Sequence, residues 1–192
     1  MHATAESPLA KPLQIRIAWR LRKAHFGGTA VAAVRELLRR VATHTAHAEG
    51  FTSGYLSVAV IGTRAMTTLH RRYRGTDEST DVLSFDLGTD RQRGLLDAEI
   101  VLCADLARRV AAAGWHGLAQ PGRGSSGARS SKRLVRGSLA AAHAELALYL
   151  VHGILHLAGY DDDTPAAARR IHAREDKLLT QLGLGPVSRE GM

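Results

Sequence analysis

Residues 152–162 have the sequence HGILHLAGYDD, which combines two histidines, two glycines and two acidic residues. His152 and His156 are four residues apart, so on a helix they lie on one face, one turn apart, and both imidazoles can reach the same ion. Gly159 allows the chain to leave the helix in a left-handed conformation and to fold back. The stretch therefore predicts a metal site on a helix and on the turn that follows it.

A third ligand is expected just after this turn. Asp162, six residues past His156, is the natural candidate, and Asp161 and Asp163 are close rivals. Three protein ligands and one open position are typical of a catalytic zinc site, because a structural zinc site is closed by four ligands. The alternative is a pair of core histidines on a buried helix. The glycine and the acids that follow the pair favour metal ligation.

A related motif, H-E-x-x-H, marks zinc peptidases, in which the glutamate after the first histidine is the general base. In this chain that position is Gly153, which has no side chain. A zinc peptidase therefore remains only the less favoured alternative.

Along the rest of the chain, hydrophobic periodicity and turn residues predict an α+β fold with about four strands and about five helices. The strands are expected at 13–19, 55–61, 82–87 and 98–103. The helices are expected at 29–47, 63–74, 105–113, 138–158 and 165–182, and the expected N-caps are Thr63, Asp105, Ser138 and Thr164. The prediction is a single domain, 13–182, with a mixed sheet. A flexible basic loop at 114–137 and tails at 1–12 and 183–192 complete the expected organisation.

The overall charge favours a polyanionic partner. The chain has 26 Lys and Arg against 18 Asp and Glu, a formal charge of +8, and a hydrophobic fraction of 45% that is sufficient for a core. Nucleic acid is preferred over membrane, because no basic amphipathic helix or apolar anchor is evident. The alternative is a basic surface that serves only solubility.

The compartment expected from the sequence is the cytoplasm. Cys103 is the single cysteine, so an intramolecular disulfide and a multi-thiolate metal site are both excluded. Residues 1–12 have no apolar run typical of a signal peptide. The most apolar stretch, 139–159, carries three histidines and Glu145 and is a poor candidate for a membrane span.

Three segments carry a resemblance to a known family. Residues 152–162 match the signature H-G-x-L-H-L-x-G-Y-D-H except at Asp162, where the family has histidine. Residues 73–85, YRGTDESTDVLSF, match Y-R-x-x-D-x-x-T-[DN]-V-L-S-F, and residues 98–103, AEIVLC, are similar to G-D-I-x-I-x. These segments appear along the chain in the family's order, and they resemble the YbeY family, the bacterial endoribonucleases of ribosomal RNA maturation.

The resemblance implies a zinc-dependent endoribonuclease specific for single-stranded RNA. It implies a role in maturation of the 3′ end of small-subunit (16S) rRNA and in ribosome quality control, with phosphodiesters hydrolysed by metal-activated water. The RNA's own 2′-hydroxyl is the alternative nucleophile. The implied ligands of one Zn²⁺ per chain are His152, His156 and Asp162. The implied partners are small-subunit rRNA and, further, small-subunit ribosomal proteins or an assembly GTPase.

Asp162 changes the expected chemistry of this site. A carboxylate removes one unit of the ion's charge, so bound water is less acidified and phosphate oxygens are attracted less strongly. Oxygen is also a harder ligand than imidazole nitrogen, so Mn²⁺ or another divalent ion such as Ni²⁺ competes better with zinc. We expect a working site with a shifted metal preference. The alternative is a noncatalytic, RNA-binding ribosome-assembly factor in which the metal is structural.

Other residues are expected to support the metal site. The resemblance implies that Arg74 lies near the metal, where its guanidinium could bind a phosphate. The alternative is that Arg74 only neutralises the partial negative charge at the C-terminal end of its own helix. Glu145 lies two turns before His152 and is a candidate proton acceptor through water, although an orienting or purely structural role is favoured. Candidate contacts to the RNA backbone are Arg39, Arg40, Lys132 and Arg133, in addition to Arg74.

Overall fold

The computed structural model describes residues 11–21, 30–113 and 139–185. The strands are β1 (Gln14–Trp19), β2 (Ser53–Ile61), β3 (Val82–Asp86) and β4 (Leu95–Cys103). The helices are α1 (Ala30–Ala48), α2 (Thr63–Arg74), α3 (Ala104–Ala113), α4 (Leu139–Leu157) and α5 (Pro165–Gln181). Within these residues the predicted α+β fold, with four strands and five helices, is confirmed. The predicted loop 114–137, which includes Lys132 and Arg133, lies outside the described residues, as do the Ser138 cap and most of both tails.

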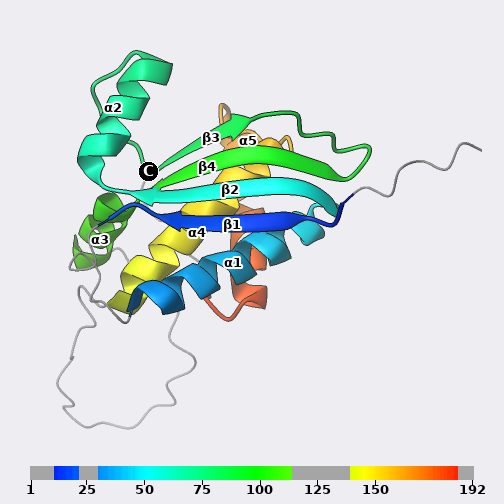
Figure 1. Cartoon of the computed structure of the whole chain (residues 1–192), viewed down its shortest axis with the longest axis horizontal. Coiled ribbons are helices and arrows are strands. Elements are labelled where there is room, and N and C mark those ends of the chain that lie inside the picture. The colour runs from blue at the N-terminus through cyan, green and yellow to red at the C-terminus, as the bar shows by residue number, and fades with distance from the viewer. Residues whose placement is uncertain (1–10, 22–29, 114–138, 186–192) are drawn as a thin grey trace, which may run out of the picture.

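The four strands form one mixed sheet in the order β1-β2-β4-β3. Strands β1, β2 and β4 are parallel neighbours, and β3 runs antiparallel to β4, to which the chain connects it by a hairpin turn (Figure 1). Alternation along β2 gives the sheet two different faces: Leu56, Val58 and Val60 are buried, whereas Tyr55 on the opposite side is exposed. The sheet is therefore covered mainly on one face.

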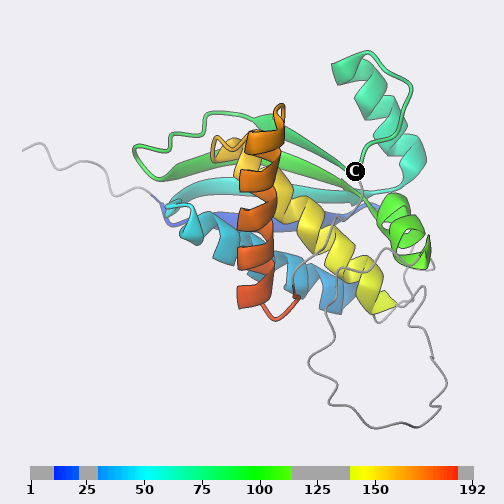
Figure 2. The same ribbon diagram turned by 180° about the vertical axis from the view of Figure 1, so that it is seen from behind.

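Helices α1 and α4 cover the buried face, and α5 packs outside α4 (Figures 1 and 2). Of the 19 residues of α4, 13 are buried, because this helix lies between the sheet and other helices. By length and composition α4 could cross a membrane, but 72% of its most apolar window is buried within the protein, as in a core helix. The amphipathic α5 contributes Ile171, Leu178 and Leu179 to the same core.

Helix α2 packs at one end of the other sheet face, over a small cluster that includes Met66, Leu83 and Cys103. Two of the predicted caps are wrong here. The N-cap of α2 is Gly62, which offers no side chain, and Thr63 is the first helical residue. Asp105 lies inside α3, and its carboxylate accepts a hydrogen bond from the Thr63 N–H at 2.8 Å. The start of α2 is thus capped from another helix, a contact that local spacing cannot predict.

The turn between α4 and α5 follows the sequence prediction closely. Gly159 adopts a left-handed conformation, with φ of +82°. Thr164 caps α5 by accepting a hydrogen bond from the Ala167 N–H, and Pro165 occupies the first turn. The carboxyl end of α4, the short acidic turn and the side of α5 are therefore held together.

Candidate metal centre

His152 and His156 lie in the last two turns of α4 and face each other. Their Nε2 atoms are 2.9 Å apart, and the ring planes are nearly perpendicular, at 86°. The exposed fraction of the side chain is 13% for His152 and 33% for His156. His152 is thus mostly buried, whereas His156 is partly accessible to solvent.

Each imidazole is oriented through its other nitrogen. His152 Nδ1 is 2.6 Å from Glu175 Oε1, and His156 Nδ1 is 3.1 Å from the Tyr160 carbonyl oxygen. Carboxylate and carbonyl oxygens only accept, so both Nδ1 atoms carry the hydrogen, and in a neutral ring of this tautomer the Nε2 atom keeps a lone pair. Two lone pairs that face each other repel unless a proton or a cation lies between them. This donor set fits a divalent metal ion.

Asp162 completes the group from the turn behind the helix. Its Oδ2 is 3.9 Å from His152 Nε2, and its Oδ1 is 3.9 Å from His156 Nε2. Ligand nitrogens about 2.0–2.1 Å from a tetrahedral zinc lie about 3.3 Å apart, so shifts of only a few tenths of an ångström would bring these atoms to coordination distance. The three residues form a group of potential ligand atoms within 4.8 Å of one another. Asp162 is 43% exposed, which leaves this side open to a substrate.

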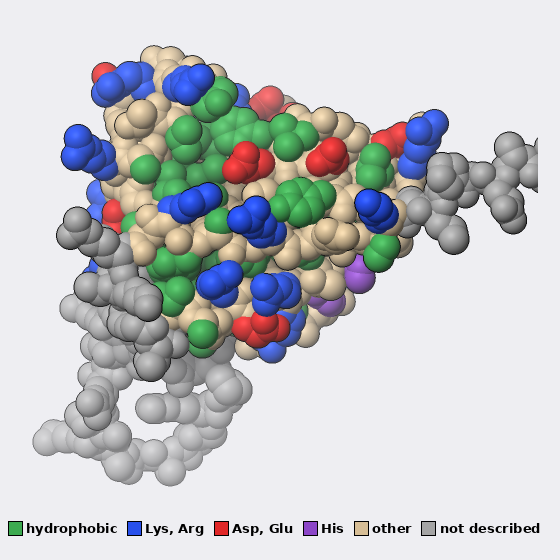
Figure 3. All heavy atoms as spheres, in the orientation of Figure 1, with side chains coloured by type: hydrophobic (Ala, Val, Ile, Leu, Met, Phe, Trp, Pro, Cys, Tyr) green, Lys and Arg blue, Asp and Glu red, His purple; other side chains and the backbone are tan. Residues whose placement is uncertain are grey.

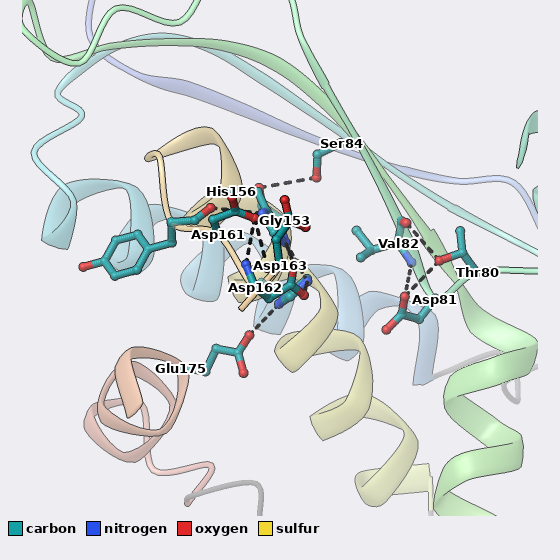
Figure 4. A network of polar contacts seen from close by, with 12 residues as sticks. Thr80, Asp81, Val82, Ser84, Gly153, His156, Asp161, Asp162, Asp163 and Glu175 are labelled. Carbon is teal, nitrogen blue, oxygen red and sulfur yellow. Dashed lines mark hydrogen bonds and ion pairs between the residues drawn. The ribbon is translucent and has the colours of Figure 1, made fainter. Parts of the chain in front are cut away.

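Asp161 and Asp163, the rival ligands, occupy different positions. Asp161 Oδ1 accepts hydrogen bonds from the backbone N–H groups of Asp162, at 2.8 Å, and Asp163, at 3.4 Å. The Asp161 carboxylate therefore shapes the turn that presents Asp162 (Figure 4). All three aspartates also lie close enough together to form a second group of potential ligands, but each of them is exposed and the group contains no histidine.

Glu175 is the site residue that the sequence analysis missed. It lies on α5, is only 2% exposed, and reaches across to His152 (Figure 4). A buried carboxylate hydrogen-bonded to a ligand histidine fixes the ring and raises its basicity. A signal was available: Ile171, Glu175 and Leu178 share one apolar stripe of α5, where a charged residue needs a partner.

We expect Glu175→Gln to weaken zinc binding by about 10- to 100-fold, because the amide cannot supply the negative charge that makes His152 a better ligand. Competition with a chromogenic chelator measures the affinity directly, without any assay of activity. Glu78→Gln, which changes an exposed glutamate, is the matched control. An unchanged zinc affinity in Glu175→Gln would contradict the role given to this residue.

At Gly153, α4 approaches the sheet closely. A Cβ built there would lie 2.7 Å from Ser84 Oγ, 3.2 Å from Val82 Cγ2 and 3.3 Å from Ile100 Cδ1. Ser84 also donates a hydrogen bond to the Gly153 carbonyl at 3.3 Å (Figure 4). The position that carries the catalytic glutamate in zinc peptidases is therefore filled by β3 and β4, and a side chain has no room there.

The other predicted site residues are not brought into this group. Arg74 is exposed at the end of α2, which extends beyond the sheet (Figure 1). Glu145 is buried within α4 and belongs to neither group of potential ligands found in the described residues. Arg39 and Arg40 are exposed on α1, and Arg39 pairs with Glu36 at 2.7 Å. The roles of these four residues remain predictions.

The fold and this site define a class: single-domain α+β proteins with a His/Asp group at a helix end that could hold a divalent cation. The family model described as Endoribonuclease YbeY matches residues 23–121 and 130–183. The chain belongs to the YbeY family.

Curated relatives support this membership, and each of the following three is named Endoribonuclease YbeY. The protein of Anaeromyxobacter sp. (strain Fw109-5) is 37% identical over 161 residues, which cover 83% of this chain and 71% of the relative. That of Anaeromyxobacter dehalogenans (strain 2CP-C) is 37% identical over 160 residues, 83% of this chain and 70% of the relative. That of Moorella thermoacetica is 33% identical over 161 residues, 77% of this chain and 85% of the relative.

Proposed function

We propose that this protein is a metal-dependent endoribonuclease that cleaves single-stranded RNA, with one zinc ion held by His152, His156 and Asp162. The observation that carries the proposal is the pair of Nε2 atoms 2.9 Å apart, each freed by a hydrogen bond at Nδ1, with a carboxylate 3.9 Å away. Membership of a family described as endoribonucleases supplies the substrate class. The working domain is 13–182.

The role of each residue follows from its contacts. His152 and His156 present two neutral donors from a rigid helix, and Glu175 holds the first of them in orientation. Asp162 contributes the third donor and one negative charge from the exposed side. When bound, a divalent cation supplies Lewis-acid chemistry: it stabilises negative charge on phosphate oxygens and lowers the pKa of water. In this proposal water attacks the phosphate, and a 2′,3′-cyclic phosphate product would instead identify the RNA 2′-hydroxyl as the nucleophile.

A basic face supports RNA as the substrate. Arginine side chains gather along the edge strand β1 and the adjoining part of α1 (Figure 3). They line an open groove of about 390 Å³; these arginines are Arg16, Arg20, Arg35 and Arg39. Contacts of this kind to phosphates give affinity and salt dependence without sequence specificity. Arg40 and Arg74 extend the proposed set of backbone contacts, as do Lys132 and Arg133.

The biological setting that we propose is maturation of the 3′ end of small-subunit rRNA and ribosome quality control in the cytoplasm. The family supports this setting, and the basic surface is compatible with rRNA as the partner. Small-subunit ribosomal proteins or an assembly GTPase are the protein partners proposed with it.

Purified protein is expected to cut a single-stranded RNA internally, to stop when a chelator removes the metal, and to resume when zinc is added back. Gel analysis of end-labelled RNA measures the cleavage, and elemental analysis measures the bound metal. Asp162→His should retain metal and shift its preference from Mn²⁺ toward Zn²⁺, since imidazole is the softer ligand. A metal-loaded protein that binds RNA and never cleaves it would identify a noncatalytic assembly factor instead.

A further inference from the structure

A second cavity adjoins the acidic turn, on the side of residues 159–161. It has a volume of about 210 Å³ and is lined by Arg91, Gly159, Tyr160, Asp161, Ala167 and Arg170. Gly159, Tyr160 and Asp161 belong to the turn that connects His156 to Asp162. The cavity and the candidate metal centre therefore share one structural element and lie next to each other.

Two arginines from distant parts of the chain converge on this cavity. Arg91 comes from the turn between β3 and β4, and Arg170 comes from the first turns of α5. The Arg91 guanidinium lies directly over the turn, because a Cβ built on Gly159 would be 3.2 Å from Arg91 Nη1. A larger residue than glycine at 159 would thus compete with Arg91 for the same space.

The charge of the cavity favours an anion. Both arginines are exposed, and neither makes an ion pair with any carboxylate in the described residues. One carboxylate, that of Asp161, lines the cavity, and its Oδ1 already accepts two backbone N–H groups. Arg93, which is two residues from Arg91, differs from it because it makes an ion pair with Asp90 at 3.5 Å. The cavity therefore has two guanidinium groups available to a ligand.

We propose that Arg91 and Arg170 bind a phosphate group of the RNA strand, next to the phosphate that is cleaved at His152, His156 and Asp162. Guanidinium groups match phosphate oxygens in a bidentate geometry, and two of them hold a phosphate more strongly than scattered surface lysines do. The inference rests on the proposed function, because it takes the bound strand to be the substrate. It assigns the positioning of RNA beside the metal centre to this pair of residues.

The double variant Arg91→Gln, Arg170→Gln tests this proposal. We expect the Kd for a short fluorescent single-stranded RNA to rise by about tenfold, since charge-assisted hydrogen bonds to one phosphate are lost. The slope of log Kd against log salt concentration should fall by about 0.7, the value for one phosphate contact on a single strand. Fluorescence anisotropy measures both quantities, with and without chelator, and bound zinc should stay at the wild-type level.

Arg93→Gln, Arg169→Gln is the matched control, because it removes the same charge from the same turn and the same helix but outside the cavity. Equal losses of affinity in the two double variants would overturn the proposal and indicate a general charge effect. An unchanged affinity and salt slope in the cavity variant would overturn it as well, as would a wild-type protein that binds no RNA. If the wild type binds RNA without cutting it, the proposed function fails, while anisotropy still decides the role of the two arginines.

Discussion

His156→Ala is expected to abolish RNA cleavage, with a loss of about 1,000-fold or more. The variant removes one of the two facing Nε2 donors and leaves two members, His152 and Asp162, of the His/Asp group. A site with two protein ligands binds zinc far more weakly than one with three, and loss of the Lewis acid removes several kcal/mol of transition-state stabilisation.

Two measurements separate this effect from unfolding. Elemental analysis should find less than one zinc per chain in His156→Ala, while circular dichroism should remain that of the wild type, because His156 is partly exposed. His47→Ala removes an exposed imidazole from α1 and should leave both metal content and cleavage unchanged. Wild-type cleavage by a nuclease-free preparation of His156→Ala would disprove the metal-dependent mechanism.

Gly153→Glu is expected to lower the free energy of unfolding by at least about 3 kcal/mol. Overpacking against Ser84, Val82 and Ile100 forces α4 away from the sheet, and the new carboxylate loses water at a tightly packed contact. Gly153→Ala should cost less, because its single methyl group displaces mainly the Ser84 hydroxyl and alanine favours the helix by roughly 0.5–1 kcal/mol.

Denaturant unfolding followed by circular dichroism measures these differences. Ala140→Glu places the same side chain on an exposed position in the first turn of α4 and should leave stability nearly unchanged. A Gly153→Glu protein with wild-type stability would show that α4 tolerates a side chain at its contact with the sheet. If that protein also hydrolysed casein, the peptidase alternative would have to be reconsidered.

Much of the fold could be predicted because its signals are local. Helical spacing identified α1 and α4, and the Thr164-Pro165 pair identified the start of α5 to the residue. Strand ends were predicted less well: β4 begins at Leu95 rather than at residue 98, because its first residues pair with the start of β2, Leu95 with Ser53 and Asp97 with Tyr55. Within the described residues, the caps at Thr63 and Asp105 failed for the same reason, since the actual partner is distant in sequence.

The chain by itself determined the pairing of His152 with His156 and the turn at Gly159. Four-residue spacing and a left-handed glycine act over one or two helical turns, so they do not depend on the rest of the molecule. Only the tertiary structure decided what surrounds them. Glu175 reaches His152 across 23 positions of sequence, and Arg91 and Arg170 line one cavity beside the α4–α5 turn, because packing of α5 and of the β3–β4 hairpin against α4 brings these segments together. Such contacts depend on how whole elements bury their apolar faces, which no short stretch of sequence specifies.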